Sequence, residues 1–438
     1  MTKRLKDMSN KVIKSMQLVR SIKPYLGSDP EFFVADKTGV IMPSDKFFPD
    51  KENPLKINNN NEGSKMFFDG IQAEINFPAA TCRESIVYYI REGLQFAKNK
   101  IGKDYTIVIE PSVEMTQQCI DDADPEARRF GCMPDFNAYT LDQNTPEMDA
   151  SKHMLRYAGG HIHVGISSPY IKENDNEYKV AKTPEGHLKV IKMMDYMAGV
   201  MLIMMDKSQA AVTRRSKYGK AGCFRPTPYG VEYRTPSCWW MKSPASLSLV
   251  FGLIRLAWNL CISNGQDELL IEEMGYSLED ARCIIDESNV QEAEKFWNKL
   301  RPYVSIMSNS TFNPLHIASL KGGNSETVST NYLESVLAGD MPLIHFFGHD
   351  KKKIMLPLDK TYAIFPLAAF DYMLINGIEN FITSNIQKEW QFVENSDGKF
   401  SYNPTTPMDN GFISRAFRLF KDNADFRKYQ MSYAKDIL

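Results

Sequence analysis

The chain has 438 residues, of which 43% are hydrophobic and 24% charged, and its formal net charge is −2. This composition is typical of a soluble globular protein, and the length predicts two domains rather than one core. The near-neutral charge excludes a general basic surface for nucleic acid. The seven cysteines form no CxxC pair, which argues against a structural zinc site and favours a reducing, intracellular setting.

Two further features concern membranes and targeting. The N-terminus is rich in Lys and Arg but lacks the apolar core of a signal peptide. The longest apolar run, near residues 197–205, is too short to span a bilayer. We therefore expect a cytoplasmic protein with no membrane partner.

In chain order, the apolar spacing of residues 1–23 predicts a short basic helix that Pro24 ends. Strands are predicted at 27–35, 67–77, 105–111 and 156–166, and from Val231 onward. Helices are predicted at 85–100, 188–207 and 246–262, with loops at 41–65, 117–145 and 214–234. After about Gly265 the pattern is mostly helical, at 267–274, 278–285, 290–300, 331–337 and 370–382. Strands interspersed with helices, without a βαβ rhythm, favour an α+β fold.

Four of the strand-like segments place polar side chains at positions i and i+2, which share one face of a strand. The pairs are Asp29 and Glu31, Glu74 and Asn76, His161 and His163, and Glu232 and Arg234. Each pair alone is compatible with an ordinary solvated strand face. If one antiparallel sheet gathered all four, neighbouring carboxylates roughly 6–7 Å apart would repel by about 2–3 kcal/mol per pair. Such an oxygen-rich face with imidazole is suited to Mg²⁺ or Mn²⁺.

A second cluster is the segment 214–225, which carries two glycines and five cationic residues: Arg214, Arg215, Lys217, Lys220 and Arg225. Arginine forks match phosphate oxygens, and glycine lets backbone N–H groups approach them. The segment is not a P-loop, because no Ser or Thr follows its Gly-Lys pair. A solvated basic loop is the alternative. Opposite an acidic metal-binding face, however, the segment predicts a site for nucleotide phosphates or an acyl phosphate.

At these residues the sequence resembles the glutamine synthetase and glutamate–cysteine ligase superfamily. GSDPEFF at 27–33, QAEIN at 72–76, GGHIH at 159–163 and VEYRTP at 231–236 resemble its metal-binding and phosphate-binding strands, in the expected order. Within it, GCMPDFNAY at 131–139 and the run from YGKAGCFR to EYRTP are similar to the phage-type carboxylate–amine ligases (COOH–NH2 ligase type 2). One departure is Asp29, which stands where glutamine synthetases usually carry the longer Glu.

The resemblance covers about residues 25–265 and implies a curved, mainly antiparallel sheet with outer helices. We therefore expect an N-terminal helical segment at 1–24, a catalytic domain at 25–265 and a mainly helical C-terminal domain of unassigned role at 266–438. The implied activity is ATP- and Mg²⁺-dependent (or Mn²⁺-dependent) amide formation through an acyl phosphate. The substrate would be a small molecule, peptide or protein bearing a carboxylate and an amine, and a homo-oligomer is left open.

The resemblance, together with the residue patterns above, predicts roles for individual residues. The expected metal ligands are Asp29, Glu31, Glu74, His161 and Glu232. The residues expected to stabilise the transferred phosphoryl group are Arg234, Arg225, Arg214 and Lys220. The expected nucleotide contacts are His163, Arg215, Tyr218 and Lys220, and the expected substrate contacts are Asp135 and Asn76. Two other readings stay open: a kinase for a guanidino or carboxyl group on the same scaffold, and a non-catalytic structural or interaction protein.

Overall fold

The computed structural model describes residues 24–57, 63–80, 83–128, 135–144, 153–166, 171–242, 244–308, 392–394 and 400–402. The chain divides into two compact units, Met1–Met307 and Ser308–Leu438. In the second unit, strands β15 (Phe392–Glu394) and β16 (Phe400–Tyr402) form an antiparallel pair. The helices predicted at 1–23, 331–337 and 370–382 lie outside the described residues. The domain limits at 24/25 and 265/266 stay predictions.

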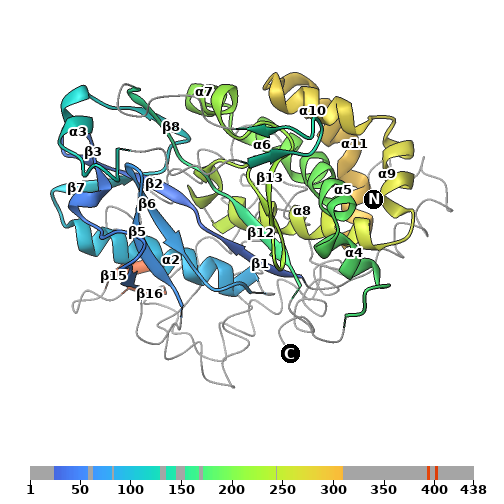
Figure 1. Cartoon of the computed structure of the whole chain (residues 1–438), viewed down its shortest axis with the longest axis horizontal. Coiled ribbons are helices and arrows are strands. Elements are labelled where there is room, and N and C mark those ends of the chain that lie inside the picture. The colour runs from blue at the N-terminus through green and yellow to red at the C-terminus, as the bar shows by residue number, and fades with distance from the viewer. Residues whose placement is uncertain are drawn as a thin grey trace. The chain divides into compact units, whose positions relative to one another are not determined.

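The first unit contains a sheet that we call the histidine sheet, with strand order β1-β12-β14-β13-β9-β10 and antiparallel pairing throughout (Figure 1). Its strands are β1 (Tyr25–Ser28), β12 (Ile162–Gly165), β14 (Gly230–Tyr233), β13 (Cys223–Thr227), β9 (Asp135–Asn137) and β10 (Gln143–Asn144). Alternation buries Ile162 and Val164 of β12, while the register places His163 opposite Glu232 of β14. One face of these strands is therefore apolar and the other carries the polar pairs.

A second sheet, which we call the acidic sheet, has the order β3-β2-β6-β5-β4, with β7 also paired to β2. Its strands are β2 (Glu31–Asp36), β3 (Ile41–Met42), β4 (Leu55–Lys56), β5 (Lys65–Asp69), β6 (Gln72–Asn76) and β7 (Tyr105–Val108), all paired antiparallel. A separate pair joins β8 (Ser112–Glu114) to β11 (Leu155–Tyr157). The buried side chains of Phe32, Phe33 and Val34 anchor β2 in the core.

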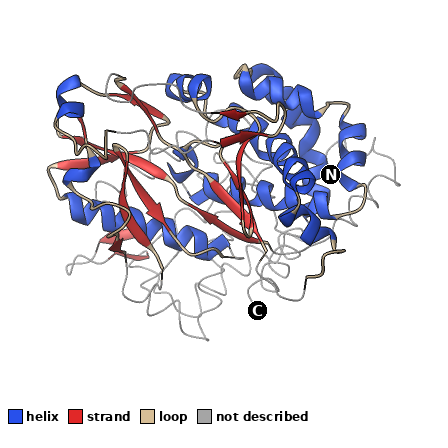
Figure 2. Ribbon diagram, viewed as in Figure 1, coloured by secondary structure: helices blue, strands red, loops and turns tan. Residues whose placement is uncertain are grey.

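Helices cover the sheets of the first unit (Figure 2). They are α2 (Arg83–Ile101), α3 (Gln117–Asp121), α4 (Asn176–Lys182), α5 (Pro184–Met194), α6 (Val200–Met205), α7 (Gln209–Lys217), α8 (Pro244–Ile262), α9 (Gln266–Met274), α10 (Leu278–Asp286) and α11 (Val290–Ser308). α4 and α5 pack against β14, α8 packs against α5, and α2 packs against β7. The α+β prediction is confirmed, as are the helices predicted at 85–100, 246–262, 267–274, 278–285 and 290–300.

Several predicted elements differ from the structure. The strand at 156–166 is divided between β11 and β12, which belong to different sheets. The strand at 27–35 is interrupted at Asp29-Pro30, where the chain leaves the histidine sheet and enters the acidic sheet. The strand at 67–77 is a hairpin that turns at Gly70, whose φ of 64° lies in the left-handed region that Asp-Gly turns require. The loop at 214–234 contains the end of α7 and all of β13. The four polar faces therefore belong to two sheets, and the expectation of a single shared sheet is wrong.

The helix predicted at 188–207 is also divided. It consists of α5, a π-helical segment at Asp195–Gly199, and α6. A Cβ atom at Gly199 would lie 2.7 Å from Ile285 Cδ1 and 2.9 Å from the Tyr233 hydroxyl. Glycine at this position thus lets the helix approach β14 and α10 closely. Short π-helical segments within α-helices are frequent at functional sites.

Candidate metal centre

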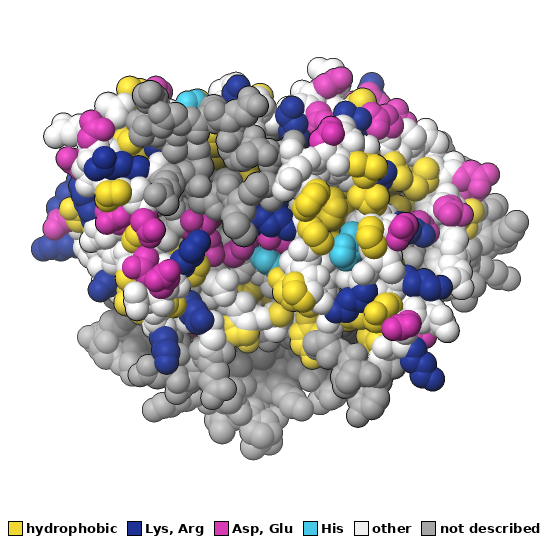
Figure 3. Space-filling view, in the orientation of Figure 1, with side chains coloured by type: hydrophobic (Ala, Val, Ile, Leu, Met, Phe, Trp, Pro, Cys, Tyr) yellow, Lys and Arg dark blue, Asp and Glu magenta, His cyan; other side chains and the backbone are white. Residues whose placement is uncertain are grey.

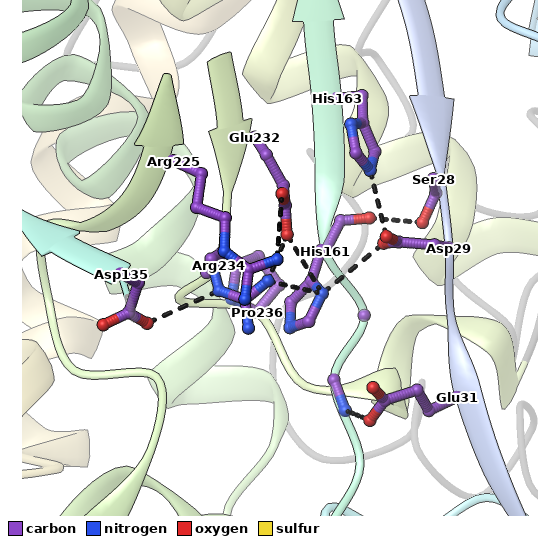
Figure 4. Close-up of polar contacts among 12 residues, drawn as sticks. Ser28, Asp29, Glu31, Asp135, His161, His163, Arg225, Glu232, Arg234 and Pro236 are labelled. Atoms are coloured by element: carbon purple, nitrogen blue, oxygen red, sulfur yellow. Dashed lines mark hydrogen bonds and ion pairs between the residues drawn. The ribbon is translucent and has the colours of Figure 1, made fainter. Parts of the chain in front are cut away.

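Asp29, at the junction of the two sheets, contacts both predicted histidines. Its Oδ1 lies 3.4 Å from His161 Nδ1, and its Oδ2 lies 3.2 Å from His163 Nε2. Figure 4 shows Asp29 reaching toward these rings, which come from the chain at the start of β12. Ser28, the last residue of β1, donates its hydroxyl to the carbonyl oxygen of His161. The break at Asp29-Pro30 is therefore what turns the carboxylate toward the histidine sheet.

Glu232 of β14 completes what we call the histidine triad, formed by Asp29, His161 and Glu232. Glu232 Oε1 lies 3.5 Å from His161 Nδ1, and ligand atoms of the three residues lie within 4.8 Å of one another. All three side chains are at most 19% exposed. Two carboxylates and an imidazole converging on one point are a donor set for a divalent cation.

A second group, the carboxylate triad, consists of Glu31, Asp69 and Glu74. Glu31 and Glu74 are direct cross-strand partners on β2 and β6, and ligand atoms of the three residues lie within 4.8 Å of one another. Glu31 Oε2 also accepts the backbone N–H of Gly159 at 2.6 Å. Asp29 and Glu31 were expected to share one face, but each contributes to a different triad.

Asp69 is a residue that the sequence analysis missed. It ends β5, and the β5–β6 register pairs Phe67 with Glu74 and Asp69 with Gln72. Cross-strand partners share a face, so Asp69 lies on the face that carries Glu74. The Asp69-Gly70 dipeptide is a hairpin signal that would have placed it there. Asn76, in contrast, ends β6 opposite Lys65 and is exposed.

The carboxylate triad is electrostatically strained. Burial and the nearby charge of Asp69 raise the pKa of Glu31 to about 8. Burial and the charge of Asp29 raise the pKa of Glu74 well above its ordinary value, and burial also raises the pKa of Asp69. Among the described residues, no Lys or Arg forms an ion pair with these three carboxylates. A divalent cation is the group that would stabilise all three in their charged form.

In the histidine triad, by contrast, the pKa shifts favour ionised carboxylates and a neutral imidazole. Burial and the charge of Arg234 lower the pKa of His161 to about 4, which keeps the imidazole neutral. Burial alone would raise the pKa of Asp29, but His163 and His161 hold it well below its ordinary value. Burial would likewise raise the pKa of Glu232, but His161 and Arg234 lower it. Neutral imidazole and ionised carboxylate are the forms that bind metal.

Two of the predicted arginines lie beside the histidine triad (Figure 4). Arg234 is 2% exposed, donates from Nη1 to Glu232 Oε1, and has Nε 3.4 Å from Asp135 Oδ2. Arg225 Nη1 lies 3.6 Å from Glu232 Oε2, and its side chain is 22% exposed. The structure thus brings Arg234, Arg225 and Asp135 together with the triad. In Figure 3, acidic, basic and histidine side chains also meet near the middle of the face shown.

Two tyrosines hold the histidines. The Tyr218 hydroxyl lies 2.6 Å from His161 Nε2 and also accepts a hydrogen bond from Arg234 Nη2. The Tyr229 hydroxyl lies 2.6 Å from His163 Nδ1, on the ring edge away from Asp29. Hydrogen bonds of this kind orient the groups around a metal. Tyr229 was not predicted as a site residue; the β13–β14 hairpin brings it close to His163.

Arg214, Arg215 and Lys220 do not contact either triad. Arg214 is 1% exposed and donates to the carbonyl oxygens of Arg234, Thr235 and Pro236 at 2.9–3.3 Å. Arg215 donates from Nε to Ser288 Oγ at 2.8 Å, and Lys220 is exposed. Arg214 therefore holds residues 234–236 through their carbonyl oxygens. Its guanidinium group is directed at these carbonyls rather than at either triad, where phosphate was expected.

We expect Arg214→Lys to lower the free energy of unfolding by about 2–4 kcal/mol, because a single ammonium leaves buried carbonyl oxygens unpaired. Urea unfolding followed by circular dichroism measures this change. Arg282→Lys is the matched control, since Arg282 forms surface ion pairs with Glu279 and Asp286. Its expected effect is below about 1 kcal/mol. Equal effects of the two substitutions would contradict the supporting role of Arg214.

The described residues thus form an α+β protein with two clusters of metal-ligand side chains beside a buried arginine. Residues 182–275 match the model of the family described as phage phiEco32-like COOH.NH2 ligase-type 2. That stretch contains Tyr218, Arg225, Glu232 and Arg234. No helix in the described part of the chain is both long and apolar enough to cross a membrane.

Comparison with solved structures gives a match to the bifunctional glutathione synthetase from Pasteurella multocida, with a TM-score of 0.43 and 11% sequence identity. The match covers 92% of this chain and 60% of that chain, so the protein spans less than two thirds of the length of that enzyme. The comparison with curated proteins gives no match. The placement in the glutamine synthetase superfamily stays a prediction.

Proposed function

We propose that the protein is an ATP- and Mg²⁺-dependent carboxylate–amine ligase that forms an amide through an acyl phosphate. The observation that carries the proposal is the contact of Arg234 and Arg225 with the histidine triad, whose charges also act on the neighbouring carboxylate triad. These residues come from strands far apart in the sequence. The match of residues 182–275 to a carboxylate–amine ligase family supports the same reaction class.

The two triads fit divalent cations in complementary ways. The carboxylate triad offers three oxygen donors that repel one another, those of Glu31 and Glu74 buried and that of Asp69 half-buried. The histidine triad offers two ionised carboxylates and a neutral imidazole. Oxygen-rich donor sets of this kind are suited to Mg²⁺ and Mn²⁺. When bound, the cations would neutralise charge on the phosphate oxygens of ATP and keep its terminal phosphate in place.

The side chains have separate tasks in such a reaction. Phosphoryl transfer depends on positioning and on charge stabilisation more than on covalent help from the protein. The guanidinium groups of Arg234 and Arg225 would stabilise the charge of the moving phosphoryl group. Asp135, whose Oδ2 lies 3.4 Å from Arg234 Nε, would accept a hydrogen bond from the incoming amine. His163 and Tyr218 would orient Asp29 and His161 rather than contact the nucleotide.

Both proposed steps conserve atoms and charge. A carboxylate oxygen of the substrate attacks the terminal phosphorus of ATP, and the bond to the bridging oxygen breaks, which releases ADP. The amine nitrogen then attacks the acyl carbon, the carbon–oxygen bond to phosphate breaks, and inorganic phosphate leaves. The nitrogen releases its surplus protons to solvent.

The protein incubated with ATP, Mg²⁺ and mixed amino acids and peptides is expected to release ADP and phosphate only when an amine acceptor is present. Mass spectrometry should detect a product equal to the two substrates minus one water. A stable phosphorylated product that forms without an amine would instead identify a kinase. ADP release no faster than without protein, across all substrate mixtures, would contradict both activities.

A further inference from the structure

The loop at residues 218–222, between α7 and β13, brings Tyr218 to the metal centre. Gly219 and Gly222 have φ values of 76° and 78°, in the left-handed region that favours glycine. A Cβ atom at Gly222 would lie 2.6 Å from the Tyr139 ring. Ala221 between them is fully buried. The conformation of this loop therefore determines where the Tyr218 hydroxyl meets His161 and Arg234.

Two carboxylates from the helical layer bind successive backbone N–H groups of this loop. Asp286, the last residue of α10, accepts the N–H of Ala221 at 2.9 Å through Oδ1. Asp195, in the π-helical segment, accepts the N–H of Gly222 at 2.6 Å through Oδ2. Hydrogen bonds to a charged acceptor are stronger than those between neutral groups. The loop is thus held by two side chains that belong to neither triad.

Asp195 also binds the strand that carries the metal centre. Its Oδ1 accepts a hydrogen bond at 2.7 Å from the hydroxyl of Tyr233, the residue between Glu232 and Arg234 on β14. Asp195 is fully buried, and this burial raises its pKa to about 7. Burying a carboxylate is unfavourable unless its hydrogen bonds are made, so the contacts to Gly222 and Tyr233 account for its presence. Asp195 therefore holds the loop at Gly222, and Asp286 holds it at Ala221.

We propose that Asp286 is a positioning residue of the metal centre: together with Asp195 it holds the loop at 218–222 and thereby keeps Tyr218 against His161 and Arg234. Its effect on turnover rests on the proposed ligase function, whereas its effect on the loop does not. Asp286 lies beyond the family match, which ends at residue 275, and beyond the predicted catalytic domain, which ends at residue 265. Through Asp286, helix α10 therefore contributes to the position of the loop that carries Tyr218.

Hydrogen–deuterium exchange of peptides spanning residues 218–225 tests the contact directly. Asp286→Ala is expected to speed exchange in this segment by about tenfold, because the Ala221 N–H loses a charged acceptor. Asp286→Asn keeps an oxygen acceptor and should restore most of the protection. Glu279→Ala is the matched control, since Glu279 also lies on α10 and also pairs with Arg282. It should leave exchange at 218–225 unchanged.

Mn²⁺ affinity and the rate of ADP formation test whether displacing the loop also alters the metal centre. Asp286→Ala is expected to weaken Mn²⁺ binding several-fold and to lower kcat for ADP formation by about tenfold, with Asp286→Asn close to wild type. Unchanged exchange and unchanged Mn²⁺ affinity in Asp286→Ala would overturn the inference. If the wild-type protein forms no ADP, the ligase proposal fails, but exchange and Mn²⁺ affinity still decide whether Asp286 positions the loop.

Discussion

Glu232→Gln is expected to reduce ADP formation by about 10³-fold, the range seen when a group that stabilises transferred charge is removed. Glu232 contacts His161 and both arginines of the proposed site. Its Oε1 lies 3.5 Å from His161 Nδ1 and accepts from Arg234, and its Oε2 lies 3.6 Å from Arg225 Nη1. Glutamine has the same shape but no charge, so it would weaken metal binding and release both arginines. The initial rate of ADP release at saturating ATP and Mg²⁺ measures the effect.

The matched control is Glu114→Gln, since Glu114 is an exposed glutamate on strand β8. The rate of ADP release by Glu114→Gln should stay within about twofold of wild type, because substitutions at exposed positions away from the site and the core usually have small effects. Circular dichroism on both variants separates loss of activity from loss of fold. Undiminished ADP formation by Glu232→Gln would exclude the histidine triad from the reaction.

The second large effect concerns stability, pH and metal. Without divalent cations, the free energy of unfolding should fall as the pH rises from about 4.5 to about 8. Burial and Asp69 raise the pKa of Glu31 from 4.5 to about 8, so the folded protein keeps this proton at pH values where the unfolded chain releases it. The stability contributed by the neutral form is complete below about pH 4.5 and is lost as the pH reaches 8. The slope is at most about 1.4 kcal/mol per pH unit for one carboxyl group.

Mg²⁺ should reverse most of this loss, because a cation stabilises the ionised carboxylates. A ligand at one hundred times its Kd adds about 2.7 kcal/mol to the stability of the folded state. Urea unfolding at pH 6 and pH 8, with EDTA or with Mg²⁺, measures both effects. Glu31→Gln should be more stable than wild type at pH 8 in EDTA and should gain little from Mg²⁺. Identical pH profiles with and without Mg²⁺ would rule out a cation at the carboxylate triad.

The position of most secondary structure in the first unit could be predicted from local pattern. Helices α2, α8 and α10 follow apolar residues at helical spacing, and β12 follows the alternation around His161 and His163. The predictions were wrong where one backbone feature changes the path of the chain. Pro30 separates β1 from β2, and Gly70 turns one expected strand into a hairpin. Such features divide a segment without altering its average composition.

Several side chains of the candidate site were predicted from the sequence, but their division into two triads was not. His161 and Glu232 meet as expected, because β12 and β14 are neighbours in one sheet. Asp69 was missed because residues 67–77 were predicted as one strand, whereas the turn at Gly70 and the β5–β6 register place Asp69 on the face of Glu74. Arg214 looked like a phosphate ligand from its neighbours in sequence, but the end of α7 turns it toward the carbonyl oxygens of residues 234–236.

The sequence by itself determined which side chains are available and, within an unbroken strand, which of them share a face, because alternation along a strand depends only on neighbouring residues. Only the tertiary structure decided which faces meet. Asp29 and Glu31 are two residues apart, yet one joins the histidine triad and the other the carboxylate triad. The physical reason is that strand pairing and helix packing are made between distant segments, so the cost of gathering buried charges is set by the whole fold.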